Sequence, residues 1–102
     1  MNENSSLTLS DRLKSVIEAY IRPYGRYSSL AEKTNIGPES WKSFWHNRQR
    51  PTVEMVEVVC SIWPQHAFWV ATGRADSANG HTSPGGFAAP EIKRASVMLL
   101  NG

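Results

Sequence analysis

Basic side chains gather in and around one short loop of this chain. The loop Asn47-Arg48-Gln49-Arg50-Pro51 directly follows a segment predicted to be helical. Guanidinium groups bind phosphates, and a helix in front of such a loop can place side chains against base edges in a major groove. The basic residues between positions 22 and 50 are Arg22, Arg26, Lys33, Lys42, Arg48 and Arg50, opposed by Glu32 and Glu39. Although the net charge is only +2, this local excess indicates a polyanionic partner.

Residues that could catalyse a reaction or bind a metal are present, but they lack the spacing that those chemistries need. The histidines His46, His66 and His81 and the single cysteine Cys60 show no metal-ligand spacing. Cys60 also lies on a predicted buried stripe, which argues against an exposed nucleophilic thiolate. No phosphate-cradling glycine loop and no paired-carboxylate motif occurs. We therefore expect no enzymatic activity, no metal, no cofactor and no small-molecule ligand.

The tryptophans offer a second route to nucleic acid, because aromatic rings can stack on the bases of a single strand. Trp41, Trp63 and Trp69, however, fall on the apolar sides of predicted helices, where packing in the core is the expected role. For Trp45 both roles stay open.

Length and composition bound the class of protein. The chain has 102 residues, enough for one domain with a modest core, and 40% of them are hydrophobic, as in folded proteins. No apolar run approaches the roughly 20 residues that span a bilayer. Residues 1–6 lack the basic and then apolar pattern of a signal peptide. Because Cys60 has no second cysteine to pair with, a reducing cytoplasm is expected.

Helix-start and helix-stop residues predict an all-α fold of five helices over residues 10–73, after a flexible N-terminus of residues 1–9. Ser10 is expected to cap the first helix. The second is predicted over 27–34, where Ser29 and Glu32 have capping-box spacing, or from a start one to three residues earlier. Gly37 and Pro38 are expected to open the third helix, since proline at the first helical position loses no hydrogen bond.

The remaining helices are predicted from their caps and apolar sides. Thr52 is expected to cap the fourth helix, and the fifth covers 65–72 and stops at Gly73. The inward side of the fourth helix is predicted to carry Val53, Val56, Val59, Cys60 and Trp63. The first helix has an apolar stripe of Leu13, Val16, Ile17, Tyr20 and Ile21. The predicted core contains Leu13, Val16, Ile17, Leu30, Ala31, Ile36, Trp41, Phe44, Val56, Val59 and Phe68.

The last part of the chain changes in composition. Residues 74–89 are rich in Gly, Ser, Ala, Asn and Pro and show no periodicity, which predicts a flexible linker. Pro90 is expected to open a short tail helix over 91–100, too short to be stable alone. Its apolar positions are Ile92, Ala95, Met98 and Leu99. We expect this helix to pair with its twin in a homodimer, or to dock back on its own domain.

Spacing within residues 30–45 is typical of two helices joined by a tight turn. Ala31 is small where the helices approach, Asn35 occupies the turn four residues later, Ile36 lies beneath the turn, and Trp41 is the buried anchor. This pattern resembles the helix-turn-helix of the phage-repressor family, also called the XRE or Cro/repressor type. Downstream, Asn47-Arg48-Gln49-Arg50-Pro51-Thr52 resembles the family's basic loop, and Phe68-Trp69-Val70-Ala71-Thr72-Gly73 its closing helix. The resemblance covers residues 10–73, and Trp41 departs from it by standing where the family has a small aliphatic residue.

The resemblance implies a compact repressor-like domain whose third helix, at about 38–45, reads double-stranded DNA. It implies base contacts from Pro38, Glu39, Lys42 and Ser43. It also implies phosphate contacts from Tyr27, Ser28, His46, Asn47, Arg48 and Arg50. A transcriptional regulator, in particular a repressor from a phage or bacterial mobile element acting on the nucleoid in the cytoplasm, is the expected function. The alternative is a protein-interaction adaptor that keeps the helical scaffold without reading DNA.

Overall fold

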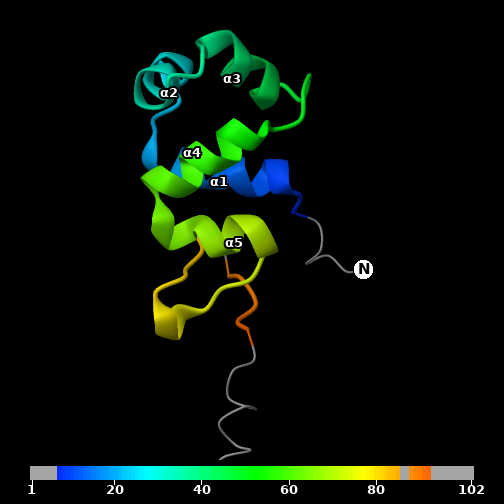
Figure 1. Cartoon of the computed structure of the whole chain (residues 1–102), viewed down its shortest axis with the longest axis vertical. Coiled ribbons are helices and arrows are strands. Elements are labelled where there is room, and N and C mark those ends of the chain that lie inside the picture. The colour runs from blue at the N-terminus through cyan, green and yellow to red at the C-terminus, as the bar shows by residue number, and fades with distance from the viewer. Residues whose placement is uncertain (1–6, 86–87, 93–102) are drawn as a thin grey trace, which may run out of the picture.

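Five α-helices follow one another along the chain in the computed structural model, which describes residues 7–85 and 88–92. They are α1 (Leu9–Tyr20), α2 (Arg26–Thr34), α3 (Pro38–Trp45), α4 (Val53–Ile62) and α5 (Ala67–Thr72), with short 3-10 turns η2 (Pro64–His66) and η3 (Ser77–Asn79). Figure 1 shows α2 and α3 at one end of the molecule, α1 and α4 across its middle, and α5 towards the other end. The predicted small all-α domain is confirmed. Within the described part of the chain, no helix is both long and apolar enough to cross a membrane.

The first two helices begin differently from the prediction. Thr8, not Ser10, caps α1: its hydroxyl accepts from the Asp11 N–H (3.1 Å), while the Asp11 carboxylate accepts from the Thr8 N–H (3.0 Å). This reciprocal pair satisfies two free helix-end groups, which Ser10 at its own position cannot do. Helix α2 begins at Arg26, one residue earlier than 27, after Gly25 with a φ of 70°. The predicted capping box of Ser29 and Glu32 is therefore wrong, because both residues lie inside the helix.

The turn after α2, the starts of α3 and α4 and the end of α5 follow the predicted signals, whereas α5 begins at Ala67 and not at 65, because Pro64–His66 form a 3-10 turn. Asn35 takes the left-handed conformation (φ 63°) after α2, and Gly37 precedes Pro38 at the first position of α3. The Thr52 hydroxyl accepts from the Met55 N–H (3.1 Å) at the start of α4. Gly73, with a φ of 78°, ends α5. These features are set by neighbours in sequence, which is why local residue types predicted them.

The core lies where α1, α4 and α5 meet and continues under α2 and α3. Of the predicted core residues, Leu13, Val16, Ile17, Leu30, Trp41, Phe44 and Val59 are buried, and Ala31, Ile36, Val56 and Phe68 are only partly buried. Trp69 and Val70 complete the buried set from α5. Tyr20 differs from the prediction, since 48% of it is exposed and its ring stacks on Trp63 with centroids 5.3 Å apart.

The buried side of α4 is rotated from the predicted one. Met55 is 0% exposed, whereas Val53, predicted to face inward, is 77% exposed. Val59 is buried one turn after Met55, and Val56 and Cys60 lie at the edge of the core, partly buried. The helix sequence Val-Glu-Met-Val-Glu-Val-Val-Cys is apolar on most sides, so apolar spacing alone does not determine which side faces the core.

Residues 74–85 and 88–92 form an arm that folds back on α5, where the sequence predicted a flexible linker. Ala75 and Glu91 make an isolated parallel bridge, in which the Ala75 N–H donates to Pro90 O and the Ile92 N–H donates to Ala75 O, both at 2.9 Å. The Thr82 N–H donates to Gln65 O at 2.9 Å, beside α5. The arm runs beneath α5 in Figure 1, away from α2 and α3.

The predicted tail helix over 91–100 does not begin where expected. Glu91 lies in the bridge and Ile92 next to it, so neither residue is helical. Ile92 is partly buried, and its backbone N–H is paired with Ala75 O. Ala95, Met98 and Leu99, the other predicted dimer contacts, lie outside the described residues.

Candidate nucleic-acid interface

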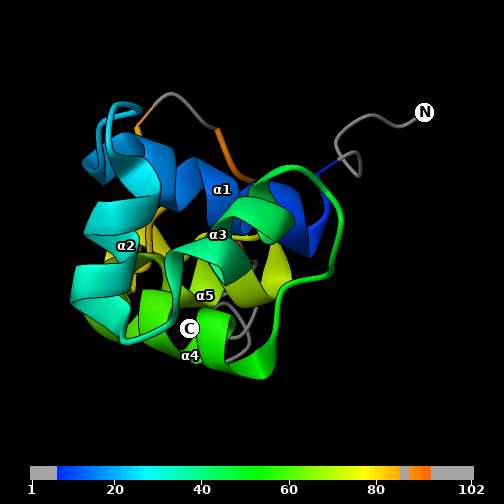
Figure 2. The ribbon, with the colours of Figure 1, turned by 90° about the horizontal axis from the view of Figure 1, so that it is seen from above.

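Helix α3 has one buried and one exposed side, and the predicted base-contacting residues share the exposed one. Trp41 and Phe44 are fully buried. The residues on the other side are Pro38, Glu39 and Lys42, all exposed, and Ser43, partly buried. Figure 2, which looks down on this end of the molecule, places α2 and α3 nearest the viewer. The structure therefore brings these four predicted residues to one accessible face.

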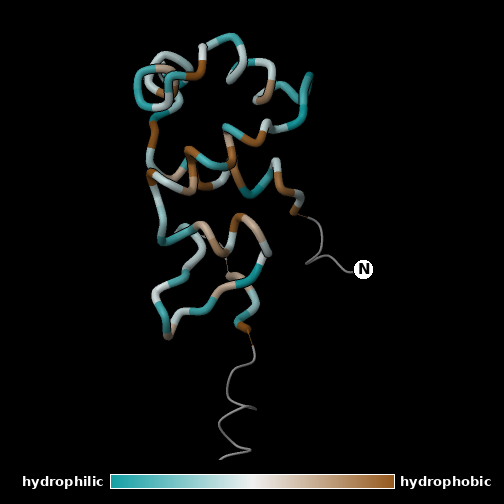
Figure 3. Tube along the Cα trace, in the orientation of Figure 1, coloured by the Kyte–Doolittle hydropathy of each residue, from teal (hydrophilic) through white to brown (hydrophobic). Residues whose placement is uncertain are grey.

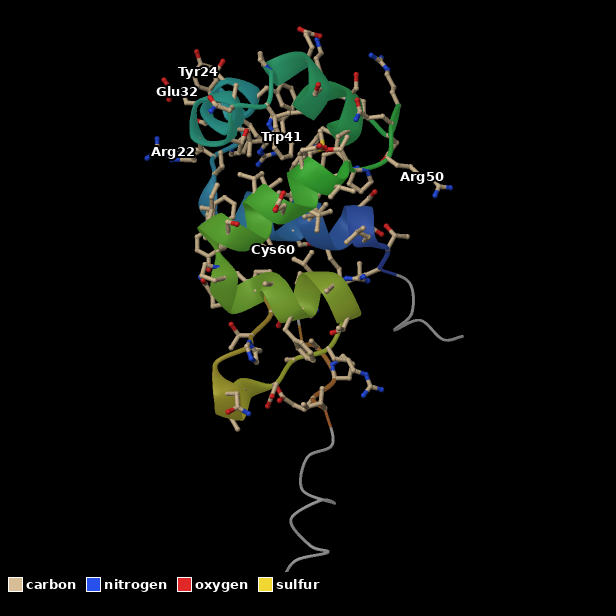
Figure 4. The ribbon with its side chains drawn as sticks, in the orientation of Figure 1. Arg22, Tyr24, Glu32, Trp41, Arg50 and Cys60 are labelled. Atoms are coloured by element: carbon tan, nitrogen blue, oxygen red, sulfur yellow. The ribbon has the colours of Figure 1, made fainter. Side chains whose placement is uncertain are left out.

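The turn between α2 and α3 is fixed by the hydroxyl of Thr34. This oxygen accepts from Trp41 Nε1 (3.1 Å) and from the Ile36 N–H (3.2 Å), and it donates to Leu30 O (2.6 Å). Trp41, labelled in Figure 4, fills the space between the helix pair and α4. The bulky residue is thus accommodated with its one polar atom paired, and α3 stays attached to α2 at the turn.

The loop after α3 displays the predicted phosphate-binding arginines. Arg48 and Arg50 are both exposed, and Arg50 projects away from the molecule in Figure 4. The loop turns at Asn47, which has a φ of 61°, and the Arg48 N–H donates to Ser43 O at 2.8 Å. Figure 3 shows this loop as one of the most hydrophilic stretches of the trace. Because Arg48 is bonded to Ser43, the backbone of the loop continues directly from the exposed side of α3.

The other predicted phosphate-binding residues lie around the same end of the molecule. Ser28 and His46 are exposed, and Tyr27 is partly buried, with its hydroxyl 3.4 Å from His46 Nε2. This contact joins the start of α2 to the end of α3.

Two cations that were not among the predicted phosphate ligands lie next to aromatic side chains at the end of α3. The Lys14 ammonium, from α1, donates to Asn47 Oδ1 at 2.7 Å and lies 5.4 Å from the centre of the Phe44 ring. The Arg26 guanidinium lies 4.4 Å from the centre of the Trp45 ring. Trp45 is therefore partly covered by its own chain. No sequence signal pointed to Lys14, because its partner Asn47 is 33 residues away.

The side chains that could bind a metal or act as a nucleophile do not form a site in the described part of the chain. No group of three or more His, Cys, Asp or Glu side chains is close enough to hold a metal ion in the part of the chain described. Burial raises the pKa of the partly buried Cys60 thiol, which disfavours the reactive thiolate. His66 is buried, with Nδ1 2.6 Å from Thr82 O and Nε2 2.7 Å from the Tyr20 hydroxyl, so both ring nitrogens have structural partners.

An open cleft of about 490 Å³ lies beside the loop, between Thr8, Leu9 and Ser10 on one side and Arg50 and Pro51 on the other. The start of α1 therefore borders the same edge of the molecule as Arg50.

Comparison with known proteins identifies no relative: no protein-family model, no curated protein and no solved structure matches this chain.

Proposed function

We propose that this chain is a sequence-specific double-stranded DNA-binding protein that regulates transcription, of the repressor-like helix-turn-helix type. One observation carries the proposal. Lys42 and Glu39 are exposed on the side of α3 opposite the buried Trp41, and the exposed Arg48 lies on the loop that follows. Donors and acceptors for bases and cations for phosphates thus share one end of the molecule, as DNA recognition requires.

Each residue on the exposed side of α3 has a chemical counterpart in the major groove. The Lys42 ammonium can donate to guanine O6 or N7, and the Glu39 carboxylate can accept from cytosine N4. The Ser43 hydroxyl can bond to a base or a phosphate, and Pro38 offers apolar contact to a thymine methyl group. Lys42 therefore supplies the main sequence preference in this proposal.

Phosphate contacts would set the strength and orientation of binding. Arg48 and Arg50 are the principal ligands, and Ser28, Tyr27, His46 and the side-chain amide nitrogen of Asn47 lie around them. Because one helix spans only a few base pairs, we propose that a homodimer binds two half-sites about one DNA turn apart. Occupying an operator in the bacterial nucleoid would block transcription there, as expected of a regulator from a phage or mobile element.

Selection of bound sequences from random double-stranded DNA tests the proposal. The chain should enrich a short motif, and Lys42→Met should weaken binding to it by roughly 1–3 kcal/mol and relax one position of the motif. Arg48→Ala and Arg50→Ala should instead weaken binding to all DNA sequences alike. Each should reduce the salt slope, the steepness with which the logarithm of the binding constant falls with the logarithm of salt concentration, by about one. A Lys42→Met chain that keeps the parent's motif would show that the reading side is misassigned.

A protein-interaction adaptor without DNA reading is the second candidate, and the exposure of Tyr24 favours it. Tyr24 is 95% exposed just before α2, and Figure 4 shows it at the edge of the molecule near Glu32. Exposed aromatic residues are frequent anchors of protein interfaces. The adaptor becomes the better account if no DNA is enriched and low-salt gel shifts with scrambled and genomic fragments show no complex.

A further inference from the structure

We propose that Lys14, on α1, is a positioning residue that holds the loop of residues 47–51 in place for binding phosphate. The inference rests on the proposed DNA-binding function and extends it to a helix outside the helix-turn-helix. Lys14 acts on DNA affinity through Asn47, without itself contacting the nucleic acid.

The contacts of Lys14 carry the inference. Its ammonium donates to Asn47 Oδ1 at 2.7 Å and lies 5.4 Å and 6.0 Å from the ring centres of Phe44 and Trp45. Lys14 is partly buried and lies at the centre of α1. Its two neighbours in sequence, Leu13 and Ser15, are buried. The cation therefore joins the rigid core helix to the first residue of the loop that lies beyond the end of α3.

Asn47 is the point at which the loop changes direction. Its φ of 61° is unusual for a residue with a side chain, although asparagine tolerates this region better than most. Its N–H donates to Phe44 O at 3.1 Å, and the next residue, Arg48, donates its N–H to Ser43 O. With the backbone tied to α3 and the side chain tied to α1, Asn47 has contacts on both sides.

Fixing Asn47 restricts the directions that Arg48 and Arg50 can take. Both arginines are exposed, and apart from a 3.4 Å bond from Gln49 Nε2 to Arg50 O, the later part of the loop has few bonds. A free loop would have to be ordered when phosphate binds, at a cost in affinity. The bond from Lys14 meets part of that cost before DNA arrives.

The test compares Lys14→Met, Asn47→Gly and the double variant of the full chain. Methionine keeps an unbranched apolar side chain over Phe44 but removes the donor, and glycine accepts a φ of 61° without strain but removes the acceptor. Arg74→Met is the matched control, since Arg74 is exposed and follows α5 at the far end of the molecule from α3 (Figure 1). The measurements are the Kd for the selected DNA, its dependence on salt, and the melting temperature.

We expect each single variant to raise Kd roughly threefold to tenfold, the equivalent of one hydrogen bond of ordinary net strength. The double variant should bind no more weakly than Asn47→Gly alone, because the bond that Lys14→Met removes is already absent there. The salt slope should stay at the parent value, because neither variant removes a cation that contacts phosphate. Arg74→Met should change Kd less than either variant. The melting temperature of every variant should lie above the temperature at which binding is measured.

Three results would overturn the inference. The first is an unchanged Kd in Lys14→Met. The second is an additive loss in the double variant, which would mean that Lys14 and Asn47 act separately. The third is a salt slope smaller by about one in Lys14→Met alone, which would make Lys14 a direct phosphate ligand. A parent chain that binds no DNA would refute the proposed function together with this inference, whereas the three results above leave the proposed function standing.

Discussion

The indole Nε1 of Trp41 donates a 3.1 Å hydrogen bond to the hydroxyl of Thr34, joining the first turn of α3 to the last residue of α2. Trp41 is fully buried, so this nitrogen depends on Thr34 for a partner inside the fold. The same hydroxyl accepts from the Ile36 N–H at 3.2 Å. One oxygen atom thus pairs two donors at the turn that orients α3.

Thr34→Val should destabilise the fold by about 1–3 kcal/mol, because it keeps the shape of the side chain but leaves two donors without their acceptor. Equilibrium unfolding in urea measures this change as a lower midpoint with an unchanged slope. Thr72→Val is the matched control. Thr72 makes the same kind of bonds at the end of α5, donating to Phe68 O (2.8 Å) and accepting from the Arg74 N–H (3.0 Å), but it is exposed and pairs no tryptophan. Equal losses in the two variants would contradict a special role for the Trp41 bond.

Met55→Ala should cost about 2–5 kcal/mol, because it opens a cavity at a fully buried position of α4. Val53→Ala, two residues earlier and 77% exposed, should change stability by less than about 0.5 kcal/mol. Thermal or urea unfolding of the two variants compares them directly. A larger loss of stability in Val53→Ala than in Met55→Ala would mean that Val53 faces the core, as apolar spacing predicted, and would contradict the burial of Met55.

The contact between Ser77 and Glu91 should depend on pH. The Ser77 hydroxyl (2.6 Å) and N–H (3.0 Å) both donate to the Glu91 carboxylate, and these bonds lower the pKa of Glu91. The contact is therefore complete above the pKa of an unfolded glutamate, about 4.3, and is lost as pH falls through the lower folded-state value. An NMR titration of the Ser77 amide should have its midpoint below about 4.3.

Ser77→Ala provides the control for that titration. It removes the hydroxyl bond, the larger cause of the lowered pKa, and keeps the backbone bond. The midpoint, followed at the residue 77 amide, should move up towards the ordinary glutamate value. A midpoint that is the same in both chains would mean that the hydroxyl does not stabilise the carboxylate.

Cys60 should react slowly with iodoacetamide at pH 8, because burial raises the pKa of its thiol and leaves less thiolate than in free cysteine. The comparison is a Cys60→Ala, Val53→Cys chain, which moves the only thiol to an exposed position of the same helix. Intact-mass measurement over time gives both rates. Similar rates would show that Cys60 is accessible and would reopen a chemical role for it.

The sequence predicted those parts of the fold that depend on neighbouring residues. Asn35, Gly37 and Pro38 marked the turn and the start of α3 because each has a backbone preference of its own. The exposed side of α3 followed from the burial of Trp41 and Phe44, which their bulk and spacing indicated. The five helices and most of the core were predicted on the same basis.

The parts that sequence reasoning missed depend on contacts between distant residues. The arm has no periodicity, since its order comes from backbone bonds such as Thr82 N–H to Gln65 O and Ile92 N–H to Ala75 O. Lys14 lies on a helix whose apolar stripe gives no hint of the loop it meets. On α4, nearly every side is apolar, and only packing against the other helices decides that Met55 and not Val53 is buried.

The bridge between Ala75 and Glu91 also determines how this domain can be joined to something else. It fixes the chain at Ile92 below α5, at the pole opposite α3 (Figure 1). Thr8, by contrast, borders the cleft that contains Arg50. Under the proposed DNA-binding function, a fluorescent protein or surface anchor joined directly after Ile92 would begin from the pole away from a duplex lying along α3. The same cargo joined directly to residue 7 would lie beside Arg50, where the proposed function places the phosphate backbone.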